Sequence, residues 1–427
     1  MRRWGLWLGL VGAGACRAEP APPRASAASV DVGPASTSVS DTPRTRGSRA
    51  HGTLEMVQGQ RVLRVWGTPR QMGHAQGLLL HDEIVDVLDG YALDVITPSQ
   101  LEAASTLYAT VADIAPNLRE EAQGVVEGMR EAGSAWIERL DREIRATDLL
   151  VMGAMTDLVA IGCSSLSAWG AATSDATGGD PMVVRNLDWD DEPALLRNQL
   201  VVVYQPSDPQ RQPVVSVSFA GYLGCLSCLN EAGVTTLFNM GYGDGSASLA
   251  QAAVGFSPAN LMLRDLLERR DVDGDGASRA DDIEFGLRAA THAGSFILHV
   301  VEPDGEEPAR VLEVESDGVH VRKPGLAGAD NVLAATNHLR GKDGPQSCRR
   351  YDTIERTSRK RGHRWDADAL WALAREVRLS EVVHTLLIQP RTRALRVWFR
   401  QPGDGAHTSA DGVELGWDTL VRVPSSL

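Results

Sequence analysis

Gly162 and Cys163 form the residue pair of this chain with the clearest potential for chemistry. Cys163 follows a helical-looking approach at 154–161 and begins the strand-like run 163–169. If the chain cuts itself after Gly162, Cys163 gains a free α-amino group with a pKa near about 8, which suits a general base at neutral pH. The pair then supplies a thiol nucleophile that carries its own base. Because a lone cysteine is more often a small buried apolar residue, the pair needs support from its context.

Polar residues at the ends of expected strands and at the start of an expected helix supply that context. These segments are Arg185-Asn186-Leu187-Asp188-Trp189, Asn239, Ala335-Thr336-Asn337-His338 and Ser347-Cys348-Arg349-Arg350-Tyr351. Strand ends converge readily in a layered fold. A thiol nucleophile needs donors for an oxyanion, a group that holds its amine and room for a leaving group. The alternative for the first segment is a surface turn with a local ion pair between Arg185 and Asp188.

Together these segments resemble the acyl-coenzyme A:6-aminopenicillanic acid acyltransferase-like family of N-terminal nucleophile hydrolases, which is related to bile salt hydrolases and acid ceramidase. The resemblance spans roughly residues 60–400 and depends on these motifs in order: Gly67-Thr68-Pro69, Gly73, Gly77, Glu121, Gly124, Gly128, Gly162-Cys163-Ser164-Ser165, Arg185-Asn186-Leu187-Asp188-Trp189, Asn230-Glu231-Ala232-Gly233, Asn239, Thr336-Asn337-His338 and Arg350-Tyr351. Gln71-Met72 departs from the family's usual acidic-basic pair, and His74 lies off the common histidine position. Both departures concern the packing of the helical pro-segment.

The resemblance implies an αββα sandwich and autocatalytic cleavage between Gly162 and Cys163. Cys163 would be the nucleophile and, through its new amine, the base. Asp188 would hold that amine, and Arg185 would lie beside the thiolate.

Three further roles follow from the same resemblance. Asn239 would donate to the oxyanion, Asn337 would support the same region, and Arg350 would stabilise the site electrostatically. Arg349 is the alternative to Arg350. We expect His338 to be structural, because the amine of the nucleophile already supplies the base.

A separate acidic motif predicts a calcium loop. Carboxylates stand at positions 1, 3, 5 and 12 of one segment, with Gly276 at position 6: Asp271, Asp273, Asp275 and Asp282. Hard oxygen ligands at this spacing suit Ca²⁺, here in a structural role. An arginine at position 9 is unusual. The alternative is an acidic surface hairpin between two helices.

The spacing of apolar residues predicts helices before Cys163 and mainly short strands after it. Helices are expected at 71–96, 99–113, 117–132, 147–160, 259–270, 281–292, 348–359 and 366–377. Strands are expected at 61–66, 163–172, 181–188, 199–205, 213–219, 233–239, 296–301, 309–315, 330–336, 384–389 and 394–399. This order indicates an α+β fold of antiparallel sheets covered by helices, with 51–162 as a mostly helical pro-segment and 163–427 as the catalytic chain.

The amino-terminal residues 1–16 have the features of an export signal. Two arginines precede an apolar run, and Ala13-Gly14-Ala15 forms a small-residue cleavage site. Cys16 follows as in a lipoprotein signal, with plain secretion after Ala15 as the alternative. Residues 17–50 have the composition of a flexible tether. We therefore expect an exported protein that meets the membrane only through a lipid anchor.

Charge and cysteine content limit the partners. The net charge is 42 − 56 = −14, which argues against nucleic acid. With Cys16 lipidated and Cys163 free, one disulfide is possible among Cys225, Cys228 and Cys348, and its pairing stays open. The C-x-x-C pair lacks a second pair or a nearby histidine motif, which favours structural cysteines over metal or redox use.

The sequence thus predicts an enzyme that cleaves an N-acyl amide bond of a small molecule through an acyl-enzyme, without a catalytic cofactor. Acyl transfer is an alternative, since it differs from hydrolysis only in the last step. A non-catalytic binding or scaffold module and an esterase or phospholipase on the same fold are further alternatives. The acyl and amine specificity and the oligomeric state stay open.

Overall fold

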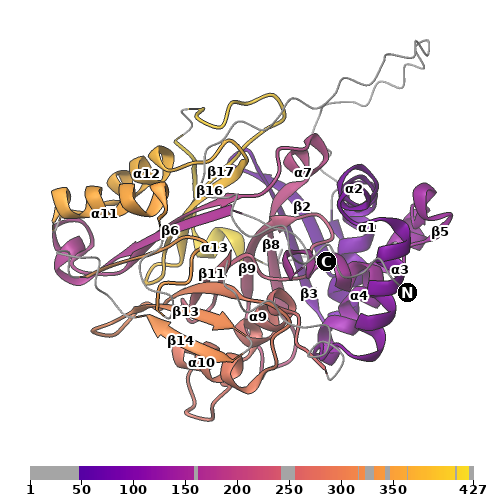
Figure 1. The fold of residues 1–427 in the computed structure, drawn as a ribbon. Coiled ribbons are helices and arrows are strands. Elements are labelled where there is room, and N and C mark those ends of the chain that lie inside the picture. Colours follow the sequence, from indigo (N-terminus) through magenta and orange to yellow (C-terminus); the bar gives the residue numbers. More distant parts are fainter. Residues whose placement is uncertain are drawn as a thin grey trace.

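Two large β-sheets lie face to face between outer layers of helices (Figure 1). The computed structural model describes residues 48–157, 162–241, 255–315, 317–322, 331–341, 347–362, 364–408 and 411–422. The order of layers is helices, ten-stranded sheet, six-stranded sheet and helices, which confirms the expected α+β class. The expected signal peptide, Cys16 and most of the tether lie outside the described residues. No helix in the described ranges is both long enough and apolar enough for a membrane crossing.

The ten-stranded sheet combines strands from both sides of Cys163. Its spatial order is β1 (Ser48–Arg49), β2 (Gly52–Val57), β3 (Gln60–Gly67), β8 (Gln199–Pro206), β9 (Val214–Phe219), β10 (Ser227–Asn230), β11 (Thr235–Met240), β12 (Phe296–Val301), β13 (Ala309–Glu315) and β14 (Gly318–Arg322). The β3–β8 pair is parallel, and the other neighbouring pairs are antiparallel. The segment before Cys163 is therefore hydrogen-bonded along a whole strand to the segment after it.

The six-stranded sheet carries Cys163. Its order is β15 (Val332–Ala335), β6 (Gly162–Ala168), β7 (Met182–Asp188), β16 (Val382–Gln389), β17 (Ala394–Phe399) and β18 (Val413–Leu415), and its neighbouring strands run antiparallel. β6 and β7 pair with Cys163 opposite Leu187. This register places the segment 162–165 beside the segment 185–188. β4 (Trp136–Ile137) and β5 (Arg142–Glu143) form a separate small hairpin.

Helices cover the outer faces of both sheets. Before Cys163 they are α1 (Pro69–Val87), the π-helical turn η1 (Leu88–Ala92), α2 (Leu93–Val95), α3 (Pro98–Thr110), α4 (Pro116–Ala132), η2 (Glu138–Leu140), α5 (Ala146–Met152) and η3 (Met155–Asp157). After Cys163 they are η4 (Gly170–Thr173), α6 (Ser174–Thr177), α7 (Pro193–Arg197), α9 (Ala259–Glu268), α10 (Ala280–Ala289), α11 (Arg349–Arg361) and α12 (Ala367–Glu376). The short helix α13 (Trp417–Leu420) instead packs with the residues between the two sheets.

Strand β8 shows how the sequence builds the layers. Val201 and Val203 pack between the two sheets, whereas Val202 and Tyr204 face the helices of the other side. Successive side chains of a strand point to opposite faces, so a strand buried on both faces is apolar throughout. On the far side of the six-stranded sheet, residues of α11 and α12 pack against β6 and β7.

The expected helices and strands are confirmed with shifted ends, apart from three corrections. The segment before Cys163 also contains β1 and β2, so it is less helical than expected. The helix expected at 71–96 changes to a π-helical turn after Val87. The helix expected at 147–160 ends already at Met152, and the separate turn η3 follows before residues 158–160, which lie outside the described residues. The strand expected at 181–188 is confirmed as β7, so Arg185 lies inside the strand. β7 pairs with β6 on one side and with β16 on the other, and this pairing keeps the polar residues of β7 in the ladder.

Helices α1 and α4 contact each other through glycines. A Cβ on Gly73 or Gly77 of α1 would lie 2.0 Å or 2.1 Å from a carbonyl oxygen of α4. A Cβ on Gly124 or Gly128 of α4 would lie 2.2 Å or 2.1 Å from a carbonyl oxygen of α1. No side chain fits there, so these four glycines allow the two helix backbones to touch.

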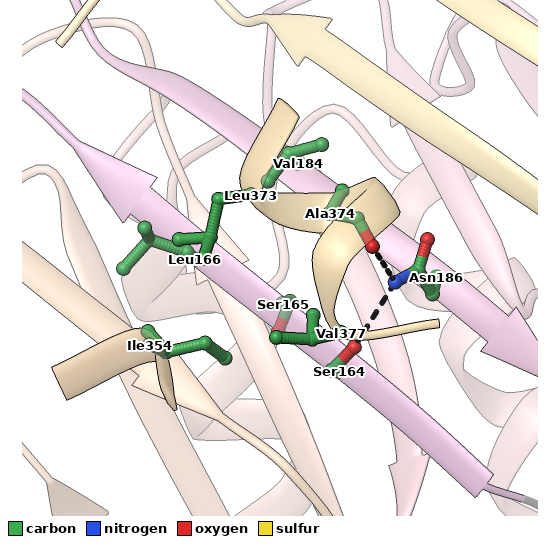
Figure 2. Close-up of a pocket in the computed structure, with 9 residues that line it drawn as sticks. All are labelled: Ser164, Ser165, Leu166, Val184, Asn186, Ile354, Leu373, Ala374 and Val377. Carbon is green, nitrogen blue, oxygen red and sulfur yellow. Dashed lines mark hydrogen bonds between the residues drawn. The ribbon is translucent and has the colours of Figure 1, made fainter. Parts of the chain in front are cut away.

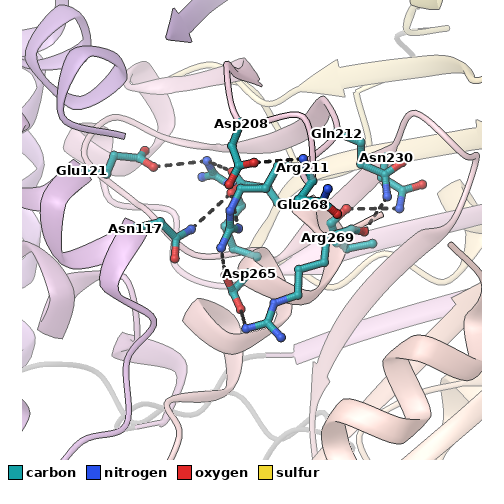
Figure 3. A network of polar contacts seen from close by, with 12 residues as sticks. Asn117, Glu121, Asp208, Arg211, Gln212, Asn230, Asp265, Glu268 and Arg269 are labelled. Carbon is teal, nitrogen blue, oxygen red and sulfur yellow. Dashed lines mark hydrogen bonds and ion pairs between the residues drawn. The ribbon is translucent and has the colours of Figure 1, made fainter. Parts of the chain in front are cut away.

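Next to this helix pair, a buried ionic network joins the two segments of the chain (Figure 3). Glu121 of α4 accepts from Nη2 of Arg264 on α9 at 3.3 Å, and Arg264 also pairs with Glu268 at 2.5 Å. Arg211 binds Glu268 at 3.0 Å from the other side. The second carboxyl oxygen of Glu121 has no hydrogen-bond partner in the described part of the chain. Burial raises the pKa of Glu121 to about 7, against the opposing effect of Arg264.

We expect Glu121 to make the free energy of unfolding depend on pH. Its carboxyl binds a proton more tightly in the folded than in the unfolded state, so stability falls as pH rises from about 4.5 to about 7. The fall is on the order of 3 kcal/mol, and Glu121→Gln should abolish it. Urea unfolding at pH 5 and pH 7.5 measures the effect, with Glu120→Gln on the exposed face of α4 as control. Equal pH slopes for wild type and Glu121→Gln would contradict the assignment.

Candidate active site

Cys163 is fully buried near the start of β6. Its Sγ accepts a hydrogen bond from Nη2 of Arg185 at 3.1 Å, from the neighbouring strand β7. Burial raises the pKa of the Cys163 thiol, and the positive charge of Arg185 opposes that rise. The arginine therefore favours the thiolate, which is the nucleophilic form of a cysteine.

Arg185 is a buried cation held by uncharged acceptors. Its Nη1 donates to the carbonyl oxygen of Leu226 at 2.5 Å and to Oγ of Ser227, and its Nη2 also donates to the carbonyl oxygen of Phe238 at 2.5 Å. In the described ranges, no carboxylate lies within 4.0 Å of its nitrogens. The alternative of a surface turn with an Arg185–Asp188 pair is wrong, because both residues are buried in β7.

Asn337 and Arg350 hold the main chain of Cys163. The Cys163 N–H donates to Oδ1 of Asn337 at 2.9 Å, and the Cys163 carbonyl oxygen accepts from Nη1 of Arg350 at 2.7 Å. Nη2 of Arg350 donates to the same Oδ1 of Asn337 at 2.7 Å. Asn337 in turn donates through Nδ2 to the carbonyl oxygen of Met240 at 3.0 Å. Residues from three distant segments thus meet around one backbone unit.

Asp188 lies in the same cluster at the end of β7. Its Oδ2 accepts from Arg350 at 3.0 Å, and its Oδ1 accepts from the Leu379 N–H at 3.4 Å. Burial raises the pKa of Asp188, and Arg350 opposes the rise. Asp188 lies directly across the ladder from Gly162. With the Gly162–Cys163 bond intact, the Cys163 nitrogen contacts Asn337, so the role of Asp188 as holder of a free amine stays a prediction.

Asn239 is buried on β11 beside this cluster. Its Nδ2 donates to the carbonyl oxygen of Thr336 at 3.3 Å, and its Oδ1 has no hydrogen-bond partner among the residues that the structure describes. The role of Asn239 as oxyanion donor stays a prediction.

The structure distinguishes Arg350 from Arg349 by burial and contacts. Arg350 is buried and bonded to the cluster, whereas Arg349 is exposed at the start of α11.

His299 connects the two sheets behind the nucleophile, and it was not among the predicted site residues. Its Nδ1 contacts Oγ of Ser165 and its Nε2 contacts Oγ of Ser167, both at 2.9 Å. Burial lowers the pKa of His299 to about 3, so the ring is neutral. Ser165 and Ser167 follow Cys163 at alternate positions, so His299 on β12 fixes the position of the nucleophile strand.

A small cavity lies on the side of the six-stranded sheet that faces α11 and α12 (Figure 2). Ser164 and Asn186 border it, and Asn186 Nδ2 donates to the Ala374 carbonyl oxygen at 2.7 Å. Cys163 does not line the cavity, and alternation along β6 directs its side chain to the other face. The cavity is therefore separate from the nucleophile.

The open question of cysteine pairing has an answer in the structure. Cys225 and Cys228 form a disulfide, and Cys163 and Cys348 are buried and take part in no disulfide among the described residues. The Cys225–Cys228 disulfide lies next to Leu226 and Ser227, which supply acceptors of Arg185.

The acidic motif forms an exposed loop between α9 and α10. Carboxylate oxygens of Asp271, Asp273 and Asp275 lie within 4.8 Å of one another, as ligands of one ion would. Asp282 instead accepts from the backbone N–H groups of Val272, Asp273 and Arg279. Calcium binding stays a prediction.

We expect Ca²⁺ to raise the free energy of unfolding by about 1.4 kcal/mol at ten times its Kd. Asp273→Asn should abolish this gain, and Asp418→Asn, at an exposed position elsewhere, should keep it. Chemical unfolding with and without Ca²⁺ measures the effect. Equal gains in wild type and Asp273→Asn would refute the loop as the site.

Several solved structures resemble this chain. An N-acylethanolamine-hydrolyzing acid amidase ortholog of Caenorhabditis elegans has a TM-score of 0.43 and 18% identity, over 56% of this chain and 100% of its own. Penicillin V acylase from Agrobacterium tumefaciens has 0.38 and 12%, over 56% and 83%. A mutant conjugated bile acid hydrolase from Clostridium perfringens has 0.38 and 10%, over 60% and 92%. No family model and no curated protein sequence matches. At these values the likeness alone assigns no activity.

Proposed function

We propose that the protein is an amide-cleaving hydrolase whose nucleophile is Cys163, activated by cleavage of the Gly162–Cys163 bond. The contact between Arg185 and Cys163 carries the proposal. A buried guanidinium without a carboxylate partner in the described ranges is costly, and a thiolate 3.1 Å away would neutralise it. Arg185 therefore opposes the rise in the pKa of the Cys163 thiol that burial causes, and it favours the reactive form of the sulfur.

Cleavage of the Gly162–Cys163 bond needs only the Cys163 thiol, the neighbouring peptide group and water. Sγ of Cys163 attacks the carbonyl carbon of Gly162, the peptide nitrogen takes up the thiol proton and leaves as an amine, and a thioester forms. Water then hydrolyses the thioester to a Gly162 carboxylate and a free Cys163 thiol. Asn337 and Arg350 support the reaction because they hold the backbone of Cys163 on both sides.

In the mature enzyme, the α-amine of Cys163 accepts the thiol proton and the thiolate attacks the acyl carbonyl of the substrate. The resulting ammonium lies near Asp188 and returns the proton to the leaving amine. Asn239 is the proposed oxyanion donor. Water finally resolves the acyl-enzyme into a carboxylic acid and free enzyme.

A panel of N-acyl amines with matched O-acyl esters tests this function. We expect release of amine and, after rapid acid quenching, an acyl group on the peptide that begins with Cys163. A new amide formed with an added amine would identify acyl transfer instead. Turnover of esters alone would assign an esterase, and neither turnover nor adduct would refute the proposal.

A further inference from the structure

We propose that the Cys225–Cys228 disulfide is a positioning element of the active site, because it fixes the turn that holds Arg185 against the nucleophile. The inference depends on the function proposed above. Leu226 and Ser227 are the two residues enclosed by the bridge, and both acceptors of Arg185 Nη1 belong to them. The other nitrogen, Nη2, contacts Sγ of Cys163.

The turn is also fixed from its other side. The Cys225 N–H donates to the carbonyl oxygen of Asn260 at 2.9 Å, and the Asn260 side chain donates to Oγ1 of Thr156. A Cβ on Gly224 would lie 2.5 Å from the carbonyl oxygen of Gly153. The bridged turn therefore lies between the chain that precedes the cleavage point and the arginine that contacts the nucleophile.

A shift of the turn would also shift the hydrogen-bond acceptors of Arg185. Leu226 O also accepts from the Phe238 N–H at 2.9 Å, and Phe238 O accepts from Nη2 of Arg185. Both cysteines are buried, so packed neighbours surround both sulfurs. Because no carboxylate in the described ranges pairs with Arg185, these neutral acceptors and Sγ of Cys163 orient its charge.

A bridge of this span acts locally. A disulfide that closes four residues removes little entropy from the unfolded chain. The covalent link instead holds the Cα atoms of Cys225 and Cys228 5.9 Å apart, on either side of Leu226 and Ser227. Without the link these two residues can shift, and hydrogen bonds tolerate only a few tenths of an ångström.

Reduction would therefore weaken the active site. A dithiol reductant supplies two electrons and two protons, leaves as its own disulfide and converts Cys225 and Cys228 into thiols. Arg185 then loses its fixed acceptors, and the Cys163 thiolate becomes less stable. We expect kcat to fall about tenfold, equivalent to one pKa unit, with KM changed less than about twofold.

Ser227→Ala and the double variant Cys225→Ser/Cys228→Ser test the inference. Ser216→Ala is the matched control: Ser216 is equally buried, lies opposite Cys228 on β9, and its hydroxyl has no hydrogen-bond partner in the described ranges. The rate of Cys163 alkylation by iodoacetamide is followed against pH by mass spectrometry of the Cys163 peptide. Both test profiles should shift about one unit upward, and the control should overlay the wild type.

The outcomes separate the inference from the function. If the alkylation profile is unchanged both in Ser227→Ala and in wild type reduced with dithiothreitol, the positioning role of the disulfide is overturned, while the proposed amide hydrolysis stands. This result decides the question even if the double variant fails to fold. Finding Cys225 and Cys228 as free thiols in fully active enzyme would overturn it as well. If wild type does not hydrolyse amides at all, the proposed function fails, and a shifted alkylation profile would still support the positioning of the thiol.

Discussion

Cys163→Ala is expected to remain one uncut chain and to lose at least about 10⁴-fold in amide hydrolysis. The substitution removes the only group proposed to attack both Gly162 and the substrate. Sγ has one defined polar contact, with Arg185, and the alanine methyl should fit the buried space without strain. Gel electrophoresis and steady-state rates on an N-acyl amine measure both effects.

Cys348→Ala is the control for this experiment, since Cys348 is the other buried cysteine outside a disulfide among the described residues. It should be cleaved normally and keep activity within about tenfold of wild type. A Cys163→Ala protein that is still cut after Gly162, or that still hydrolyses amides at the wild-type rate, would exclude Cys163 as the nucleophile.

Arg350→Met has the second largest expected effect. Methionine keeps much of the aliphatic volume but removes the hydrogen bonds to the Cys163 carbonyl, to Asn337 and to Asp188. It leaves the Asp188 carboxylate buried without its cation, which typically costs about 3–5 kcal/mol. We expect that loss in the free energy of unfolding, together with a fall in kcat of about 100-fold or more.

Arg349→Met provides the matched comparison, because Arg349 precedes Arg350 on α11 but is exposed. It should change stability by less than about 0.5 kcal/mol and leave cleavage intact. Equal effects of the two substitutions would show that general charge on α11, rather than the contacts of Arg350, matters.

The sequence predicted the strands well where apolar residues alternate or run together. β12 (Phe296–Val301) and β13 (Ala309–Glu315) were predicted with their observed ends. The strand expected at 181–188 also matches β7, whose neighbours on both sides keep Arg185 and Asp188 in the ladder. Local pattern failed for the helix expected at 147–160, which ends at Met152.

The candidate site was predicted as a set of residues but not as a network. Motif order identified Cys163, Arg185 and Arg350, but no spacing shows that Asn337 contacts the Cys163 nitrogen. Every residue type has a backbone carbonyl oxygen, so the sequence could not predict that Leu226 O accepts a hydrogen bond from Arg185.

His299 was missed for a related reason. It lies in an apolar strand without a neighbouring polar motif, and its partners Ser165 and Ser167 belong to the other sheet. Only the stacking of the two sheets brings them together. A serine at alternate positions after the nucleophile was the one available signal, and it is a weak one.

The central claim is that Cys163 becomes the first residue of the catalytic chain. Intact mass and amino-terminal sequencing of purified, amide-hydrolysing protein test it most directly. We predict a chain that starts at Cys163 and a second chain that ends at Gly162. Active protein in which Gly162 and Cys163 are still joined would contradict the account.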